Sequence, residues 1–253
     1  MSRSDNPHLF VFIGGVHRSG TTLLGQLLAE HGDASGFVNT GVPADEGQHL
    51  QTVYPPAREF GGPGKFAFAH DVALTETSPL VSGAHDRLLA EWSPYWDIGR
   101  RVLIEKSPPN LLRFRFLQEV FPGASCVAVL RHPIAVAYAT QKWSKTSIPS
   151  LLEHWLTAHE RFAADQPLLK NVLEVRYERL VADPETTVGA LEQSLGLPPH
   201  PPETKVEAGS NERYFERWRT ESQRLVRGLQ LRRAARRLEA RANEFGYSLD
   251  ELS

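Results

Sequence analysis

The chain has 253 residues, of which 41% are hydrophobic, enough for the core of one large α/β domain. Its formal net charge of −2 does not indicate a general nucleic-acid-binding surface. The single cysteine, Cys126, excludes an internal disulfide framework, and its place in an apolar run predicts a buried, inert thiol. Since we find neither the apolar core of a signal peptide nor a run long enough to span a membrane, we expect a cytoplasmic protein without a membrane span.

Four short apolar runs alternate with helical patterns along the chain. They cover residues 9–13, 102–104, 125–130 and 172–175, and a weaker fifth candidate lies at 34–38. Each of the four leads into a turn and then a helical pattern, which is typical of parallel strands joined by crossover helices. The sequence therefore predicts an α/β fold with a central, mainly parallel sheet flanked by helices, and we expect residues 1–253 to form a single domain.

Apolar periodicity and capping residues predict the helices. One helix follows the first strand, a second covers about residues 149–164, and a third begins at the Asp183 cap. Residues 209–245 form an expected helical C-terminal extension, rich in arginine and divided in two near Gly228. The basic face of this extension is either solvated or places an arginine near its start on an anionic ligand.

Two long segments, residues 39–64 and 75–97, lack such periodicity and contain several glycines and prolines. Long irregular segments in compact domains often bind ligands, so we interpret both as binding loops. Together with the residues between them they offer aromatic side chains for stacking on a ligand: Phe60, Phe66, Phe68, Trp92, Tyr95 and Trp96.

Residues 15–22 read G-V-H-R-S-G-T-T between the first strand and the first helix, the layout of a phosphate-binding P-loop. The spacing is that of a Walker A loop, but Thr21 occupies the position of the lysine and Arg18 supplies a positive charge from within the loop. Glycines at both ends allow the backbone to approach a ligand, and the loop N–H groups then point toward an anion. The loop therefore predicts an anion site unlike that of the usual nucleotide hydrolases. A glycine turn without a ligand is the structural alternative.

Two further cations and an aromatic residue follow the later strands. Lys106 comes directly after the strand at 102–104, Arg131 after that at 125–130, and Tyr177 soon after the last strand. The carboxyl ends of parallel strands face the ligand crevice of an open α/β sheet. We therefore interpret both cations as ligand-binding, although a surface lysine and a helix-capping arginine are the alternatives. Tyr177 fits an adenine-packing residue and a core aromatic equally well.

Four motifs, in this order, resemble the sulfotransferases that use 3′-phosphoadenosine 5′-phosphosulfate (PAPS). They are H-R-S-G-T-T (17–22), E-K-S-P (105–108), R-H-P-I-A-V-A-Y-A-T (131–140) and V-R-Y-E-R-L-V-A-D-P (175–184). The resemblance spans residues 9 to about 196 and is closer to the tyrosylprotein and carbohydrate sulfotransferases than to the cytosolic phenol and steroid enzymes. It implies a three-layer P-loop fold, PAPS as sulfuryl donor, its desulfated product PAP, and no metal. The acceptor would carry a hydroxyl on a sugar, a phenol or tyrosine, or a small metabolite.

The resemblance also implies roles for individual residues at the donor site. Residues 18–22 would hold the 5′-phosphosulfate, with Arg18 next to the leaving phosphate. Lys106 would contact the transferring sulfuryl group, and Arg131 would bind the 3′-phosphate. The implied nucleotide-binding positions up to the last strand are Gly15, His17, Arg18, Ser19, Gly20, Thr21, Thr22, Arg131 and Tyr177.

The resemblance is weaker at the rest of the 3′-phosphate site. The family usually has a serine eight residues after the arginine, where this chain has Ala139. Thr140 or Gln141 would then take the place of that serine. The expected residues of the late nucleotide-binding loop are Asn211, Arg213 and Tyr214.

An acceptor hydroxyl needs a general base, which in the tyrosylprotein and carbohydrate relatives is a glutamate just after the second strand. Glu46 is our first candidate here, and His49 is the second because imidazole titrates near neutrality. His17 within the loop is a remoter candidate. The structural alternative for Glu46 is an exposed loop acid.

Two other classes of protein are consistent with a P-loop. A P-loop kinase or nucleotide hydrolase would need a lysine at position 21 and an acid that holds a metal ion. A non-catalytic nucleotide-binding protein on the same fold would have the same anion site without the chemistry, since a fold does not determine a function.

Overall fold

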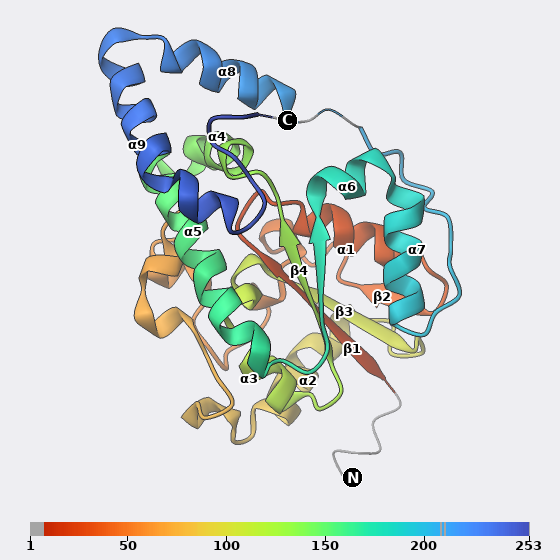
Figure 1. Cartoon of the computed structure of the whole chain (residues 1–253). Helices are drawn as coiled ribbons and strands as arrows, with labels where there is room; N and C mark the ends of the chain where they lie inside the picture. The colour runs from red at the N-terminus through yellow and green to blue at the C-terminus, as the bar shows by residue number, and fades with distance from the viewer. Residues whose placement is uncertain (1–7, 208, 210, 253) are drawn as a thin grey trace.

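The structure, a computed structural model, describes residues 8–207, 209 and 211–252. Its five strands form one parallel sheet in the order β2-β3-β1-β4-β5 (Figure 1). The predicted parallel sheet is thus confirmed, including the weak fifth strand, which is shorter than expected. The strands are β1 (Leu9–Gly15), β2 (Ala34–Gly36), β3 (Val102–Lys106), β4 (Ser125–Leu130) and β5 (Val172–Arg176).

The order of the strands determines where the ligand crevice lies. From β1 the chain crosses to β2 and β3 on one side, and then returns past β1 to β4 and β5 on the other. The connections therefore diverge at the carboxyl end of β1, which is the switch point where open α/β sheets bind their ligands. β3 and β4 are buried along their whole length, which explains the apolar runs at 102–104 and 125–130.

Helices cover both faces of the sheet, so the molecule has the predicted three layers (Figure 1). Alternate residues of β1 enter different cores: Phe10 and Phe12 face one, Val11 and Ile13 the other. The core with Val11 is closed by α1 (Thr21–Ala29), α6 (Tyr177–Ala182) and α7 (Pro184–Ser194). The larger core with Phe10 is closed by α2 (Ala84–Trp92), α3 (Phe114–Val120), α4 (Pro133–Ser144) and α5 (Ile148–Asp165). Cys126 is buried there, and burial raises the pKa of its thiol, as its position predicted.

The interpretation of residues 75–97 as a loop is wrong. They contain α2 between two short 3-10 turns, Pro79–Val81 and Ser93–Tyr95. Leu88 and Trp92 of α2 lie one turn apart and are both fully buried in the larger core. Residues 39–64 contain only the 3-10 turns Pro43–Asp45, Gly47–His49 and Ala57–Phe60. The remaining 3-10 turns are Phe66–Phe68, His70–Val72, Pro108–Leu112 and Gln166–Leu168.

The C-terminal extension consists of two helices, α8 (Glu212–Ser222) and α9 (Leu225–Asn243), which pack on α4 and α5 (Figure 1). The predicted break at Gly228 is wrong, because the helices divide at residues 223–224 and Gly228 lies inside α9. A Cβ atom at position 228 would lie 2.3 Å from the carbonyl oxygen of Ser222. This glycine therefore allows the two helices to approach closely. In the described part of the chain no helix has the length and apolar character to cross a membrane.

Candidate active site

The P-loop joins the end of β1 to the start of α1 at the switch point. Arg18 (φ 73°) and Gly20 (φ 106°) both adopt the left-handed conformation, which turns successive N–H groups toward one side. Gly20 is the N-cap of α1 and provides no side-chain cap, so the first N–H groups of the helix remain available to an anion. The Ser19 hydroxyl is buried, and we find no hydrogen-bond partner for it within the described residues. The uncapped N–H groups at the start of α1 fit a bound anionic group, whereas the enclosed Ser19 hydroxyl lines none of the cavities that we find among the described residues.

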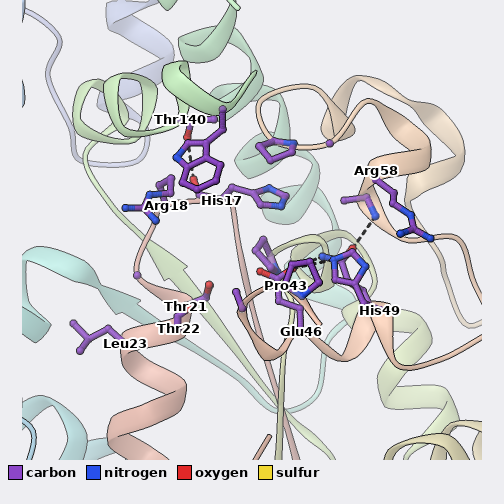
Figure 2. A pocket seen from close by; sticks show the side chains of 18 of the residues that line it. His17, Arg18, Thr21, Thr22, Leu23, Pro43, Glu46, His49, Arg58 and Thr140 are labelled. Carbon is purple, nitrogen blue, oxygen red and sulfur yellow. Dashed lines mark hydrogen bonds and ion pairs between the residues drawn. The ribbon is translucent and has the colours of Figure 1, made fainter. Parts of the chain in front are cut away.

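The loop forms one wall of a cavity of about 520 Å³, which we call the main cavity (Figure 2). Arg18, His17 and Thr140 lie on one side in the view, and Glu46, His49 and Arg58 on the other. The structure thus brings the P-loop and both candidate bases to the same cavity. Further lining residues are Gly20, Thr21, Thr22, Leu23, Pro43, Ala44, Gln48, Ala57, Gly62, Pro63, Pro108, Arg131, Trp143 and Tyr177.

Arg131 is tied directly to the P-loop. Its Nη1 donates to the carbonyl oxygen of Arg18 at 3.0 Å, and its Nε donates to Oδ1 of Asn211 at 2.8 Å. The guanidinium lies 4.1 Å from the centre of the Tyr177 ring. A Cβ atom at Gly20 would lie 2.4 Å from that ring, so Tyr177 packs against both the loop and the arginine. The structure therefore brings Asn211 and Tyr177 to Arg131, as expected for residues of one site.

The other expected nucleotide-site residues divide between two hollows. Thr140 donates a hydrogen bond of 3.3 Å to the carbonyl oxygen of His17 and lines the main cavity. Ala139, Arg213 and Tyr214 instead line a neighbouring hollow of about 530 Å³, together with Tyr138, Gln141, Lys142 and Arg217. Of the two candidates to replace the missing serine, only Thr140 faces the main cavity.

Lys106 is buried at the carboxyl end of β3. It lines another hollow, which shares Thr22 and Ala44 with the main cavity, and it is not among the residues that line the main cavity itself. Its Nζ donates to the carbonyl oxygen of Ala44 at 2.6 Å and lies 3.7 Å from Oε1 of Glu46. Burial lowers the pKa of Lys106, and the neighbouring carboxylates oppose that change. The amino group of this last residue of β3 is thus held between a carbonyl and a carboxylate.

Glu46 is buried at the main cavity, which contradicts the exposed-loop alternative. Burial raises the pKa of its carboxyl, and the charge of Lys106 opposes that rise. Gln48 Nε2 donates to Oε2 at 2.5 Å, and His49 Nε2 lies 3.8 Å from the same oxygen. A carboxylate with a raised pKa is a stronger base than an exposed one at neutral pH. Burial lowers the pKa of His49, and lowers that of the partly buried His17 to about 3, so both imidazoles are favoured in their neutral form.

The turn that carries Glu46 is docked on the strand that carries Lys106. Glu105, fully buried, accepts hydrogen bonds from the Gly47 N–H (3.0 Å), the Ser107 hydroxyl (2.5 Å) and Asn110 Nδ2 (2.5 Å). A Cβ atom at Gly47 would lie 2.4 Å from Cγ of Glu105, so only glycine fits there. Trp92 Nε1 donates to the carbonyl oxygen of Gly47 from the other side. Glu105 therefore sets the position of Glu46 relative to Lys106.

A comparison with known families shows the family of the chain. Residues 11–202 match the model of the sulfotransferase family. The chain belongs to the sulfotransferase family. The activity that this family implies is the transfer of a sulfuryl group to an acceptor substrate.

Individual relatives agree with this assignment. The sulfotransferase is 28% identical to the nodulation protein NoeE of Sinorhizobium fredii, in an alignment covering 79% of this chain and 53% of NoeE. The chain thus spans about half the length of that relative. Its fold is similar to a sulfotransferase domain of the curacin biosynthetic pathway (TM-score 0.53, 16% identity, 98% of this chain and 99% of that one). It is also similar to the sulfotransferase domain of the Synechococcus PCC 7002 olefin synthase (TM-score 0.52, 22% identity, 76% and 74%).

Sequence reasoning missed several residues of this sulfotransferase's cavity. The six aromatics expected to stack on a ligand are absent from the lining, and Phe66, Trp92 and Trp96 are core residues. The lining instead includes Trp143, on the last turn of α4, and Arg58. Glu105 was also missed, although an acid inside an otherwise apolar strand is itself a signal of a buried polar contact.

Proposed function

We propose that this sulfotransferase takes its sulfuryl group from PAPS and transfers it to an acceptor hydroxyl in the main cavity. The observation that carries the proposal is the bond between Arg131 and the Arg18 carbonyl, because it joins two separate anion-binding elements in one cavity. PAPS is anionic at two places, the 5′-phosphosulfate and the 3′-phosphate. A single phosphate would need only the P-loop.

In this proposal the donor lies across the loop. The N–H groups and hydroxyls of residues 18–22 hold the 5′-phosphosulfate, and Arg131 holds the 3′-phosphate in the fork geometry of a guanidinium. Asn211 orients Arg131 by accepting from its Nε, and Thr140 supports the loop at the carbonyl of His17.

Transfer is an in-line displacement at sulfur. The acceptor oxygen forms the new S–O bond while the bond from sulfur to the 5′-phosphate oxygen breaks, and its electron pair leaves with 3′,5′-ADP. Glu46 takes the proton of the acceptor hydroxyl, with His49 as the second candidate. Arg18 and Lys106 stabilise the negative charge that develops on the leaving oxygen, because a cation already in place needs no reorganisation during the reaction. To reach the donor, the Lys106 amino group gives up its hydrogen bond to the carbonyl oxygen of Ala44.

Transfer of ³⁵S from labelled PAPS to pooled glycans, phenols and peptides tests the proposal, with Lys106→Ala as the critical variant. We expect the rate to fall roughly 10²- to 10³-fold, since a preorganised charge-stabilising group is lost. The exposed Lys170→Ala is the matched control and should transfer at the wild-type rate. The affinity of Lys106→Ala for 3′,5′-ADP should change little.

Two results would contradict the proposal. Lys106→Ala might retain the wild-type rate, which would remove Lys106 from the chemistry. Alternatively, ATP with Mg²⁺ could raise the melting temperature more than 3′,5′-ADP does, which would favour a P-loop kinase or hydrolase, because a ligand stabilises the folded state in proportion to its affinity.

A further inference from the structure

Trp143 stands out among the five tryptophans, all of which lie in the described part of the chain. Its relative exposure is 62%, whereas the other four are 0–6% exposed. It also lines the main cavity. A large aromatic surface left in water at the entrance to a cavity is typical of a site that a ligand covers.

Trp143 follows Thr140 by three residues on α4, and Figure 2 places Thr140 on the same side of the main cavity as Arg18, opposite Arg58. The last turns of α4 pack against the end of the segment that carries Glu46, because a Cβ atom at Gly64 would lie 3.4 Å from both Thr140 and Ser144. Trp143 immediately precedes Ser144. The donor elements Arg131 and Tyr177 lie at the carboxyl ends of β4 and β5.

Arg58 adds a positive charge to the same cavity. Figure 2 shows it on the side opposite Thr140 and close to His49. Its side chain is 73% exposed and pairs with Glu59 at 3.4 Å, and such an exposed pair contributes little. Of the described residues that line the cavity, Glu46 is the only acidic one, and it is buried. Lys142 Nζ, 5.4 Å from the Trp143 ring, adds another cation nearby.

We propose that the acceptor is a ring-bearing hydroxyl compound with a negatively charged substituent. The flat face of the ring stacks on Trp143, the substituent pairs with Arg58, and the hydroxyl reaches Glu46. The inference rests on the proposed function, since it names the substrate class of that site. A sugar ring and an aromatic ring both offer a flat face to an indole, so the test includes both sources.

Because Trp143 is the exposed tryptophan, acrylamide quenching of tryptophan fluorescence reports on it selectively. The probes are two pairs that differ in one carboxylate: phenol with 4-hydroxybenzoate, and methyl glucoside with methyl glucuronide. We expect a charged probe to protect the fluorescence from acrylamide in the presence of 3′,5′-ADP, and its neutral partner to bind roughly three- to fivefold more weakly. The pair that protects identifies the ring as sugar or aryl.

Three variants separate the contributions. Trp143→Ala should raise the KM for the protecting probe roughly three- to tenfold at little-changed kcat, and Trp143→Phe should restore most of the loss. Arg58→Gln should remove the preference for the charged probe. Tyr95→Ala, an exposed aromatic away from the cavity, is the control and should behave as the wild type.

Several outcomes would overturn the inference while leaving the proposed function intact. One is that no probe protects Trp143 although 3′,5′-ADP binds. Another is that the neutral and charged probes bind alike. A third is that 3′,5′-ADP alone protects Trp143 and binds Trp143→Ala more weakly, which would place the indole at the donor. Failure of the wild type to bind 3′,5′-ADP would instead contradict the proposed function itself.

Discussion

The buried carboxylate of Glu105 offers the sharpest prediction about how this active site is held together. Glu105→Ala removes the acceptor of three donors: the Gly47 N–H, the Ser107 hydroxyl and Asn110 Nδ2. Asn110 keeps a second partner, the carbonyl oxygen of Ile13 at 3.2 Å, and a hydroxyl can rotate. The Gly47 N–H is therefore the group left buried and unpaired.

The magnitude follows from that contact. One buried unpaired donor costs about 1–3 kcal/mol, so with the cavity left by the side chain we expect a loss of about 3 kcal/mol in the free energy of unfolding. The turn with Glu46 then shifts, and a displacement of about 1 Å at a reacting group can cost roughly 10²-fold in kcat. The affinity for 3′,5′-ADP should stay within about threefold, because Arg18 and Arg131 do not contact Glu105.

Two variants distinguish the role of Glu105 in holding the turn with Glu46 from a role of its negative charge. Glu105→Gln keeps an oxygen for the Gly47 N–H, but its new amide nitrogen faces Asn110 Nδ2. The Asn110 amide must therefore flip to present Oδ1, and it then gives up its bond to the carbonyl oxygen of Ile13. We expect it to lose about 1 kcal/mol and to retain most of its kcat. Gly47→Ala keeps the carboxylate but forces the turn away, so it should reproduce the kcat loss of Glu105→Ala.

Urea unfolding, ³⁵S transfer and calorimetric binding of 3′,5′-ADP measure these quantities. The reasoning would be refuted by a fully stable Glu105→Gln whose kcat falls as far as that of Glu105→Ala. In that case the charge of Glu105, rather than its hydrogen bonds, would be what the reaction needs. An unchanged kcat in Gly47→Ala would equally contradict the docking role.

Three other properties can be predicted. Burial strongly lowers the pKa of four histidines, from 6.5 to about 3 or 4. Since the unfolded chain binds these protons and the folded chain does not, the free energy of unfolding should fall as pH drops below 6.5, by up to about 1.4 kcal/mol per pH unit for each. A urea midpoint that rises between pH 7 and pH 5 would contradict this; the four are His17 and His154 (pKa about 3) and His132 and His159 (pKa about 4). Gly20→Ala should weaken 3′,5′-ADP binding at least tenfold by calorimetry, because its Cβ meets Tyr177 and strains a left-handed residue; unchanged affinity would refute the loop geometry. Gly228→Ala should separate α8 from α9 and lower the melting temperature by a few degrees, and a stabilised variant would show that the contact with Ser222 is not tight.

The fold was largely predictable because its signals are local. Strands buried on both faces of a parallel sheet are continuous apolar runs, and the P-loop is contiguous in sequence between a strand and a helix. Helix α2 was missed since it spans only nine residues between short 3-10 turns. Gly228 was misinterpreted because a glycine that breaks a helix and one that permits close packing look the same in sequence.

The site was predictable only where one motif carries it. Lys106 and Arg131 each sit at a strand end, and the P-loop with Thr21 follows β1, which fixes their side of the sheet. The contact between Gly47 and Glu105 joins residues 58 positions apart, and that between Arg131 and Asn211 joins residues 80 apart. Such contacts depend on how the loops pack, which no local pattern encodes. The same holds for Trp143, whose exposure distinguishes it from the buried aromatics only in three dimensions.

The central claim is that two linked anion sites hold the two ends of one donor. Calorimetric titration of the wild type and Arg131→Ala with 3′,5′-ADP and with 5′-AMP tests it most directly. The two ligands differ only in the charged 3′-phosphate, which 3′,5′-ADP carries and 5′-AMP lacks. One charged hydrogen-bonded contact should make the wild type bind 3′,5′-ADP roughly 10- to 100-fold more tightly than 5′-AMP. Arg131→Ala should bind both nucleotides alike, with 5′-AMP as the control for an intact loop. Equal affinities in the wild type, or a preference that survives in Arg131→Ala, would contradict the account.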